Sequence, residues 1–246
     1  MNKFTTLLSA GLLAANVSYA EFNRESLEKA TGLSLGYNAS WTSHYVWRGE
    51  DQSSKDMSPS IGADLGHSSG LYAGVWAGSI SSFSGAEFDA YFGYAFDFGP
   101  LSIDIGDLYY LYPGETDETQ FNEYYLSVGT EIPIGGFSIS PYIYLAYAPK
   151  WYGPNTPDVF YSEFGVEVPI PDSPISISYT FGNIDTDDLD GDAEKANDID
   201  SWHYHYLTFG FGEVLGLDAS VTFHTAPGYK ADAGSDGAFV TLGHEW

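Results

Sequence analysis

Apolar and polar residues alternate along this chain with a period of two from residue 33 onward. The first stretch carries an apolar row made of Leu33, Leu35, Tyr37, Ala39, Trp41, Tyr45 and Trp47. Its polar row is made of Ser34, Gly36, Asn38, Ser40, Thr42, His44 and Arg48. Because successive side chains of a β-strand point to opposite faces of a sheet, the pattern predicts one half-polar strand over 33–47.

The same alternation recurs along the rest of the chain, interrupted by turn residues. Over 86–98, for example, the apolar row Phe88, Ala90, Phe92, Tyr94 and Phe96 opposes Glu87, Asp89, Tyr91, Gly93 and Asp97. The recurrence predicts an all-β protein of about twelve strands. The expected strands after the first are 58–67, 70–80, 86–98, 100–112, 120–132, 136–149, 158–168, 173–183, 200–212, 215–225 and 237–246.

The connections between these strands alternate between short and long. Short connections are expected at 66–70, 99–100, 133–136, 170–172 and 213–214, and long ones at 49–57, 81–85, 113–119, 150–157, 184–199 and 226–236. A soluble β-sandwich has no reason to keep this rhythm, whereas outer-membrane barrels join their strands by short periplasmic turns and longer external loops. We therefore expect residues 33–246 to form a closed antiparallel transmembrane β-barrel with both termini on the periplasmic side.

The end of the chain supports this expectation, and two internal residues depart from it. The last strand closes on the aromatic residue Trp246, preceded at alternate positions by His244, Leu242, Val240 and Ala238. A terminal strand of this kind is typical of outer-membrane barrels and is read by their assembly machinery, which is therefore an expected partner. Pro141 removes a ladder hydrogen bond and Asp107 falls on an apolar row, so both are expected at bulges or strand ends.

The first residues have the pattern of an export signal. Lys3 supplies a positive start, residues 4–15 form an apolar stretch, and Ser18-Tyr19-Ala20 is a small-residue cleavage site. The apolar stretch is too short to span a bilayer. We expect residues 1–20 to be a signal peptide cleaved after Ala20, and the polar residues 21–32 to be a periplasmic leader.

Composition and charge narrow the function. Of 246 residues, 17% are aromatic, 20 are Tyr and 28 are Gly, whereas Cys is absent. Without Cys, disulfides, thiolate metal sites and thiol catalysis are excluded. The formal net charge of −26 excludes nucleic acid as an expected partner, because a polyanion releases no counterions from another. The charge draws cations if it lines a pore, and otherwise forms a solvated acidic surface.

Arg48, one of two arginines, is the sharpest candidate for a functional residue. It falls on the polar row at the external end of the first strand, with Glu87 and Asp89 as expected partners across the lumen. A guanidinium facing carboxylates would form a charge filter, although a structural ion pair that anchors a loop is the favoured interpretation. Inward carboxylates outnumber inward bases, which predicts cation preference in an open lumen and hydrogen-bond networks in a plugged one. The expected pore and charge-filter residues are Arg48, Glu87, Asp89, Asp104, Glu123 and Glu163.

Metal binding has two weaker candidates, and no cofactor is expected. The loop over 185–192 has oxygen-rich spacing before Gly191, but position twelve of a calcium loop would be Asn197, so the bidentate Glu is missing. Its candidate ligands are Asp187, Asp188, Asp190 and Asp192, and a solvated acidic loop is the alternative. His203 and His205 share a strand face but are only two ligands, so an aromatic belt is the better interpretation.

Several motifs fit a known pattern. Thr42–Gly49 is followed by Gln52-Ser53 and Pro59; Gly70–Trp76 reads Gly-x-Tyr-x-Gly-x-Trp; Glu87 and Asp89 form an acidic pair; and Tyr110–Gly114, which reads Tyr-x-Tyr-Pro-Gly, precedes Asn122–Tyr125. Together they resemble the proteobacterial TorF porin family, specifically in the first half and loosely after about Pro149. Trp47 and Glu50-Asp51 depart from that pattern. The resemblance implies an outer-membrane β-barrel and indicates a location better than a substrate.

The sequence therefore predicts an outer-membrane channel, not an enzyme, for passive diffusion of small hydrophilic solutes, with cation preference from its inward carboxylates and Arg48. Expected partners are the outer-membrane lipid bilayer, the assembly machinery and small solutes, and a homo-oligomer is left open. One alternative is a non-transporting structural or surface-interaction barrel with a closed lumen. The less favoured one is an outer-membrane phospholipase, for which no serine is marked as a nucleophile.

Overall fold

The computed structural model describes residues 28–29, 31–83, 85–115, 119–151, 158–186, 201–227 and 236–246. Within these residues no helix combines the length and apolar character that crossing a membrane requires. The structure is built from strands, with these bounds: β1 Leu33–Thr42, β2 Val46–Trp47, β3 Glu50–Asp51, β4 Ser58–His67, β5 Leu71–Ser79, β6 Ala86–Phe98, β7 Leu101–Leu111, β8 Phe121–Thr130, β9 Ile132–Ile134, β10 Phe137–Ala148, β11 Val159–Pro169, β12 Ser176–Asp185, β13 Trp202–Val214, β14 Leu217–Thr225 and β15 Asp236–Glu245.

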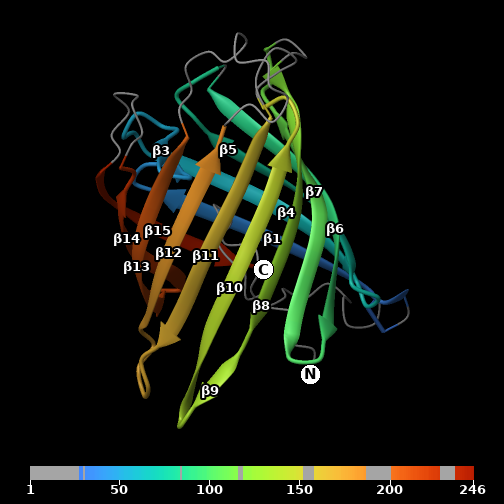
Figure 1. The fold of residues 1–246 in the computed structure, drawn as a ribbon, viewed down its shortest axis with the longest axis vertical. Coiled ribbons are helices and arrows are strands. Elements are labelled where there is room, and N and C mark those ends of the chain that lie inside the picture. The colour runs from blue at the N-terminus through green and yellow to red at the C-terminus, as the bar shows by residue number, and fades with distance from the viewer. Residues whose placement is uncertain are drawn as a thin grey trace.

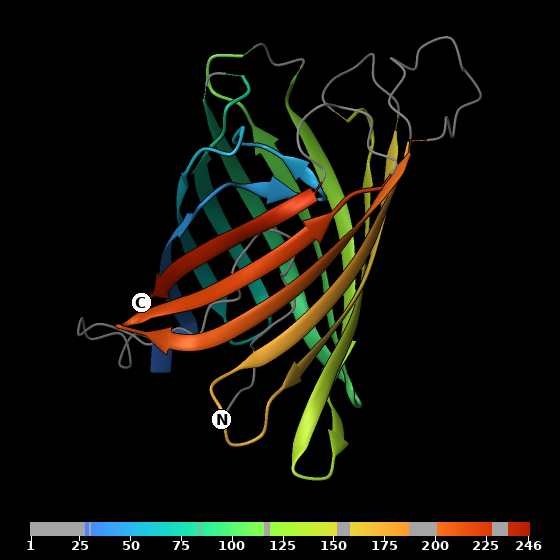
Figure 2. The ribbon, with the colours of Figure 1, turned by 90° about the vertical axis from the view of Figure 1, so that its left-hand side faces the viewer.

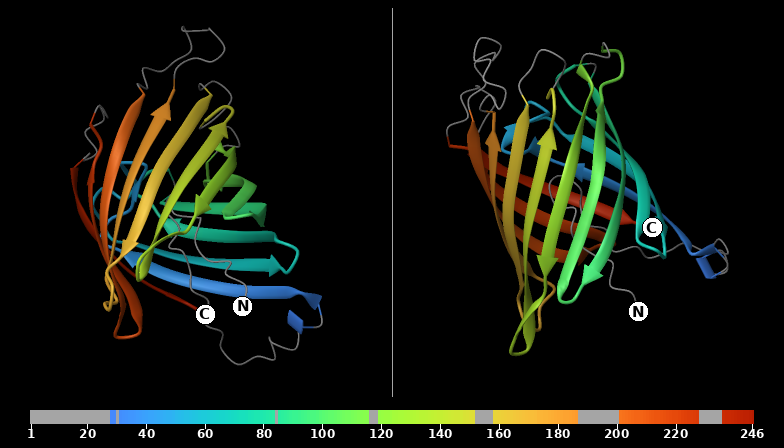
Figure 3. Two further views of the ribbon diagram at one scale, coloured as in Figure 1. Left: turned by 60° about the horizontal axis from the view of Figure 1, so that its bottom comes forward. Right: turned by 45° about the vertical axis from the view of Figure 1, so that its right-hand side comes forward.

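Twelve long strands form one closed antiparallel barrel (Figures 1, 2 and 3), which confirms the predicted fold class. Neighbours along the chain pair with each other, β1 pairs with both β4 and β15, and the β10–β11 pairing completes the ring. The short strand β9 continues β8 along β10, beyond the end of the main wall. Closure leaves the twelve long strands without a free edge strand, which is the condition for a sheet to stand in hydrocarbon.

The two ends of the barrel differ in their connections. At one end the strands are joined by the segments 68–70, 99–100, 135–136, 170–175 and 215–216, and at the other by 43–57, 80–85, 112–120, 149–158, 186–201 and 226–235. The first and last strands begin and end together at the short-turn end, where Tyr37 and Trp246 exchange backbone hydrogen bonds. The alternation of short and long connections predicted from the sequence is thus confirmed.

The wall carries apolar side chains outside and polar ones inside. In β6, Phe88 and Phe92 are 46% and 62% exposed, whereas Asp89 and Tyr91 between them are buried at 7% and 6%. Leu, Ile, Val and Phe side chains are exposed in this way on strands all round the barrel, among them Val75, Ile105, Ile143, Phe164 and Phe223. A large exposed apolar surface is unfavourable in water and favourable against lipid, so the wall has the polarity of a transmembrane barrel.

Inside the barrel, glycines and tyrosines pair directly across neighbouring strands. A Cβ added at the glycine would collide with the tyrosine ring, so each ring lies over the bare backbone of its cross-strand partner. The pairs are Gly74 with Tyr91, Gly93 with Tyr72, Gly106 with Tyr125, Gly165 with Tyr142 and Gly182 with Tyr204. This arrangement accounts for five of the 28 Gly and five of the 20 Tyr residues.

The first strand is shorter than predicted. β1 ends at Thr42, and Ser43 then bonds through its backbone N–H to the carbonyl of Val240 at 2.9 Å. Beyond it the chain leaves the wall, and β2 and β3 form a hairpin folded into the barrel (Figure 2). Trp47, expected on the outer apolar row, is therefore buried inside at 6% exposure. The predicted strand end was wrong because the hairpin strands in the lumen show the same two-residue alternation as the strands of the wall.

The two irregular residues have different outcomes. Asp107 pairs regularly with Phe92 and Tyr124, so the expected bulge or strand end is wrong there. Its carboxylate instead accepts a hydrogen bond from the Asn122 side chain at 3.2 Å. Pro141 lies inside β10 in regular register with Val166 of β11, at the point where the other neighbour of β10 changes from β9 to β8.

Candidate functional site

The hairpin inside the barrel turns at Arg48 and Gly49. Trp47 pairs with Glu50 across a two-residue loop, and Arg48 and Gly49 have φ angles of 49° and 83°. Two central residues with positive φ define a type I′ turn, the form that matches the twist of short antiparallel hairpins. The turn places the guanidinium at the tip of the hairpin.

The backbone of the turn lies directly against the barrel wall. The N–H of Gly49 donates to the hydroxyl of Tyr206 at 2.8 Å, and the indole N–H of Trp202 donates to the carbonyl of Arg48 at 2.9 Å. A Cβ at Gly49 would approach the Cβ atoms of Ala226 and Tyr204 to 2.7 and 2.8 Å. Glycine is therefore required at this position both for its φ and for its lack of a side chain.

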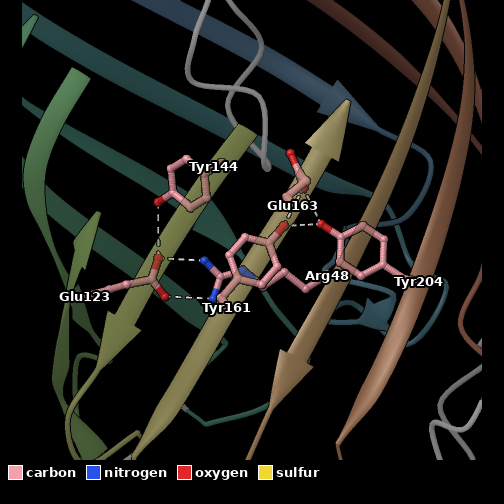
Figure 4. A network of polar contacts seen from close by, with 6 residues as sticks. All are labelled: Arg48, Glu123, Tyr144, Tyr161, Glu163 and Tyr204. Carbon is pink, nitrogen blue, oxygen red and sulfur yellow. Dashed lines mark hydrogen bonds and ion pairs between the residues drawn. The ribbon is translucent and has the colours of Figure 1, made fainter. Parts of the chain in front are cut away.

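Arg48 forms a bidentate ion pair with Glu123 of β8 (Figure 4). The two guanidinium nitrogens donate to the two carboxylate oxygens at 2.7 and 2.6 Å, and the pair is 3% and 1% exposed. The guanidinium carbon lies 3.7 Å from the ring centroid of Tyr161 and 4.3 Å from that of Trp47. Charge-assisted fork geometry between aromatic faces is a strong arrangement for arginine. The ion pair and the two ring contacts hold the hairpin tip in place.

Tyr161 connects this pair to a second buried carboxylate, and other tyrosine hydroxyls bond each carboxylate. The hydroxyl of Tyr144 donates to Glu123 at 3.3 Å, and those of Tyr161 and Tyr204 donate to Glu163 on β11. Figure 4 shows that the ring of Tyr161 lies beside the guanidinium while its hydroxyl reaches Glu163. Tyr142 donates a further hydrogen bond to Glu163 at 2.6 Å. Arg48 and Glu163 are thus linked through Tyr161, whose ring contacts the guanidinium and whose hydroxyl donates to Glu163.

The remaining predicted site residues also face inward. Glu87 accepts a hydrogen bond from Tyr45 at 3.2 Å, and Asp104 accepts one from Tyr72 at 2.7 Å. Asp89 is 7% exposed, and one of its oxygens has no hydrogen-bond partner among the described residues. The structure therefore brings Arg48 together with Glu123, not with Glu87 and Asp89 as predicted. The difference arises because Arg48 is carried into the lumen by the hairpin instead of facing it from the wall.

Aromatic rings enclose the hairpin tip. Trp47 packs edge-on against Tyr110, with 5.8 Å between centroids, and lies at 6.5 Å from the ring of Trp151, which lies 5.9 Å from Trp202. Tyr110 stacks on Phe121 at 4.5 Å, and all five side chains are buried. The lumen is therefore constricted at the level of the hairpin. Sequence reasoning missed this cluster because it missed the hairpin that brings Trp47 into it. The available signal was Arg48-Gly49, since glycine as the second residue between two short extended runs favours a hairpin turn.

Sequence reasoning also missed a buried carboxylate at the other end of the lumen. Glu245 in β15 is 6% exposed, and its Oε2 has no partner among the described residues. The alternation that placed His244 and Leu242 on the apolar row already put Glu245 on the inward one.

The described residues include only some of the candidate metal ligands. Asp187, Asp188, Asp190 and Asp192 lie outside the described residues, so the acidic loop stays a prediction. His203 and His205 lie on β13 beside Phe181, and Tyr179 is hydrogen-bonded to His205 at 2.7 Å. The described residues contain no group of three or more His, Cys, Asp or Glu side chains able to hold a metal ion. An aromatic-rich setting fits the aromatic-belt interpretation of the two histidines.

Fold and interior together define a porin-type β-barrel: a closed twelve-stranded wall, apolar outside, with carboxylates and an inward hairpin inside. Residues 26–204 match the sequence profile of a family described as "Bacterial protein of unknown function (Gcw_chp)". The match extends over more than half of the chain, so the protein belongs to this family. No curated protein matches the chain in sequence.

Solved porin structures share the fold at very low sequence identity. The KdgM porin has 8% identity and a TM-score of 0.54, over 86% of this chain and 97% of that porin. The NanC porin has 10% identity and a TM-score of 0.54, over 85% of this chain and 98% of that porin. A structure described as "KdgM porin in complex with disordered oligogalacturonate" has 8% identity and a TM-score of 0.52, over 86% and 97% of the two chains. At such identities the similarity concerns the barrel fold alone.

Proposed function

We propose that the protein is an outer-membrane channel through which small hydrophilic solutes diffuse passively, with a preference for cations. The observation that carries the proposal is the inverted polarity of the closed wall, with Phe, Ile and Val outside and carboxylates within. A wall of this polarity encloses a water-compatible path across hydrocarbon. The shared fold with porins supports the same function and a role that is not enzymatic.

The charge of the lumen supports the cation preference. Among the described residues, Arg48 is the one Lys or Arg side chain that is buried. It is paired with Glu123, and the other buried carboxylates of the wall have no basic partner there. These other carboxylates are Glu87, Asp89, Asp104, Glu163 and Glu245. Rings of Asp and Glu lining a pore favour cations and oppose anions.

The negative charge of the lumen also indicates which class of solute passes. The KdgM porin is described in complex with oligogalacturonate, a chain of carboxylated sugars. A lumen whose carboxylates have no basic partner repels such a polyanion. We therefore propose small cations and neutral solutes for this channel, not acidic oligosaccharides. The in-folded hairpin and its aromatic surroundings set the upper size, because they narrow the lumen near Arg48.

Several expectations from the sequence belong to the same proposal. We propose residues 1–20 as a signal peptide cleaved after Ala20, 21–32 as a periplasmic leader, and assembly by the machinery that reads the terminal strand. Both termini would be periplasmic, since the barrel begins and ends at the end with the short turns. We also propose membership of the TorF porin family, which the motifs around Arg48 support, and leave self-association open.

A second candidate function is a structural or surface-interaction barrel whose lumen is closed. The observation that favours it is the burial of the aromatic cluster at the hairpin, where Tyr161 and Tyr204 are 0% exposed. Side chains that fill the cross-section leave no continuous aqueous path. In this case the carboxylates and tyrosines would form hydrogen bonds with one another and would hold the hairpin in place.

Uptake into proteoliposomes tests the two candidates. Osmotic swelling with lysine, glutamine and glutamate compares solutes of similar size and different charge, and the channel predicts lysine fastest and glutamate slowest. One unit charge about 5 Å from a permeating ion in water contributes about 0.8 kcal/mol, so Asp104→Asn changes the rate of a charged solute by up to about fourfold. Asp172→Asn, in an exposed turn outside the lumen, is the matched control and leaves the rates unchanged. Faster glutamate uptake contradicts the proposal, and no swelling with any solute favours the closed barrel.

A further inference from the structure

Two histidines from distant parts of the chain are hydrogen-bonded to each other at the end of the barrel with the long connections. His44 lies in the segment between β1 and the β2–β3 hairpin, and His224 lies near the end of β14 and is buried. Their Nε2 atoms are 3.4 Å apart. Phe239 of β15 packs against both rings at 5.6 and 5.8 Å, and Tyr206 of β13 lies edge-on to His224 at 6.5 Å. The contact therefore joins the start of the hairpin segment to the wall.

His44 lies at the point where the chain passes from the wall into the hairpin. Just before it, the backbone N–H of Ser43 donates to the carbonyl of Val240 at 2.9 Å, and the N–H of Val240 donates to the Ser43 hydroxyl at 3.0 Å. Just after it, the N–H of Tyr45 donates to the hydroxyl of Ser53 at 2.8 Å, within the hairpin segment. A change at His44 therefore acts on the root of the hairpin and leaves the strand pairing of β1 intact.

The hydrogen bond between the two rings has room for one proton. A neutral imidazole has one N–H donor and one bare acceptor nitrogen, so one Nε2 donates to the other. When both rings are protonated, both Nε2 atoms carry a hydrogen, the hydrogen bond is lost, and two positive charges repel each other at this short distance. The Nδ1 of His224 has no partner among the described residues, so a proton there would also be a buried donor without an acceptor.

The charged groups around the pair act in both directions. Asp51 of β3 and Asp236 at the start of β15 favour protonation of His224, whereas Lys55 opposes it. Burial is the largest influence on His44, which lies outside the wall strands, and it lowers the pKa of this imidazole; Asp51 raises that pKa and Lys55 lowers it. Because a lowered pKa means that proton uptake favours the undocked hairpin, docking is complete above the ordinary histidine pKa of about 6.5 and weakens as the pH falls below it.

We propose that His44 and His224 form an acid-sensitive switch, in which the neutral pair holds the root of the hairpin on the wall and the doubly protonated pair releases it. A histidine that takes up its proton only in the released state shifts the docking equilibrium by up to about thirtyfold at a pH of about 5. Since the docked hairpin constricts the lumen, its release in acid widens the lumen at that level. The switch is separate from the Arg48–Glu123 ion pair and does not depend on whether solutes pass through the barrel.

Cysteine reactivity of the full-length chain in detergent tests the proposal, since the chain itself lacks Cys. Val46 of β2 is 6% exposed, so Val46→Cys reacts with a water-soluble pyridyl disulfide when the hairpin is released. Met57, which is 66% exposed and follows the hairpin, gives in Met57→Cys the rate of an accessible thiol at the same pH. The ratio of the two rates removes the pH dependence of the thiol itself. We expect this ratio to rise by about tenfold or more between a pH of about 7.5 and a pH of about 5.

Histidine variants in both cysteine backgrounds separate the pair from the carboxylates of the lumen, whose own protonation they leave in place. His44→Gln and His224→Gln each remove one of the two charges and are expected to reduce the rise, and the double variant abolishes it. His67→Gln, exposed at the opposite end of the barrel, is the matched control and keeps the full rise. Heat-modifiable migration on gels verifies that each variant is folded. The proposal is overturned if the ratio stays constant with pH while both histidines are present, or if the full rise persists in either single variant or in the double variant.

Discussion

Replacing Glu123 by Gln removes the negative charge that holds the Arg48 guanidinium inside the barrel. The side chain keeps its shape, but the carboxylate that accepts two hydrogen bonds, at 2.7 and 2.6 Å, becomes an amide with one oxygen. Arg48 is left as a buried charge without an ionic partner, since no other ion pair to it is formed among the described residues. We expect the hairpin to leave its docked position more often.

The size of the effect follows from the burial of the pair. Removing one partner of a buried ion pair costs about 3–5 kcal/mol. The amide still accepts one hydrogen bond, so we take the lower end, about 3 kcal/mol. That value corresponds to a change of about 150-fold in the ratio of docked to undocked hairpin.

Single-channel recording and unfolding measure this change in two ways. Glu123→Gln is expected to give larger or more frequent openings in planar bilayers and a lower urea midpoint in lipid vesicles, followed by tryptophan fluorescence from rings near the hairpin such as Trp47. Glu213→Gln, an exposed carboxylate on β13, is the control and matches wild type. The reasoning is refuted if the recordings and the midpoint of Glu123→Gln are those of the wild-type chain.

Further predictions concern the turn and the polarity of the wall. Gly49→Ala is expected to undock the hairpin and to lower the urea midpoint by more than Gly216→Ala. Gly216 has a similar φ of 84° but no atom within 4 Å, so its substitution bears only the backbone cost of about 1–2 kcal/mol. Equal midpoints of the two variants would contradict the close packing of the turn at Gly49. The chain lacks Cys, so single cysteines report their surroundings: Phe92→Cys should react in vesicles with a bilayer-confined maleimide only, and Asp104→Cys with a small water-soluble thiosulfonate only. The reverse labelling would invert the assignment of the two faces.

The strands were predictable because their alternation has a single physical cause. β6 was expected over 86–98 and spans Ala86–Phe98, since each second residue meets either lipid or the lumen. The alternation of short and long connections between the strands favours a barrel over a sandwich, and it can be read from the sequence alone. What the period does not encode is whether a segment stays in the wall, so Trp47 was assigned to the outer face although it lies within.

The candidate site was predictable only as a set of residues. Arg48 and Glu123 were both selected by their inward parity, but their pairing joins positions 75 residues apart through barrel closure and the inward hairpin. The Gly–Tyr pairs, such as Gly182 with Tyr204, depend in the same way on strand register. Alternation specifies the face of a residue, whereas these contacts require the three-dimensional neighbours.

The zero-current potential of the purified chain in a planar bilayer with a potassium chloride gradient is the most direct test of a carboxylate-lined channel. The account predicts stepwise conductance with a potential of the sign set by potassium movement, and a smaller potential when Asp104 is replaced by Asn. A potential of the opposite sign, set by chloride movement, or a membrane that stays silent while the folded barrel is inserted, would contradict it.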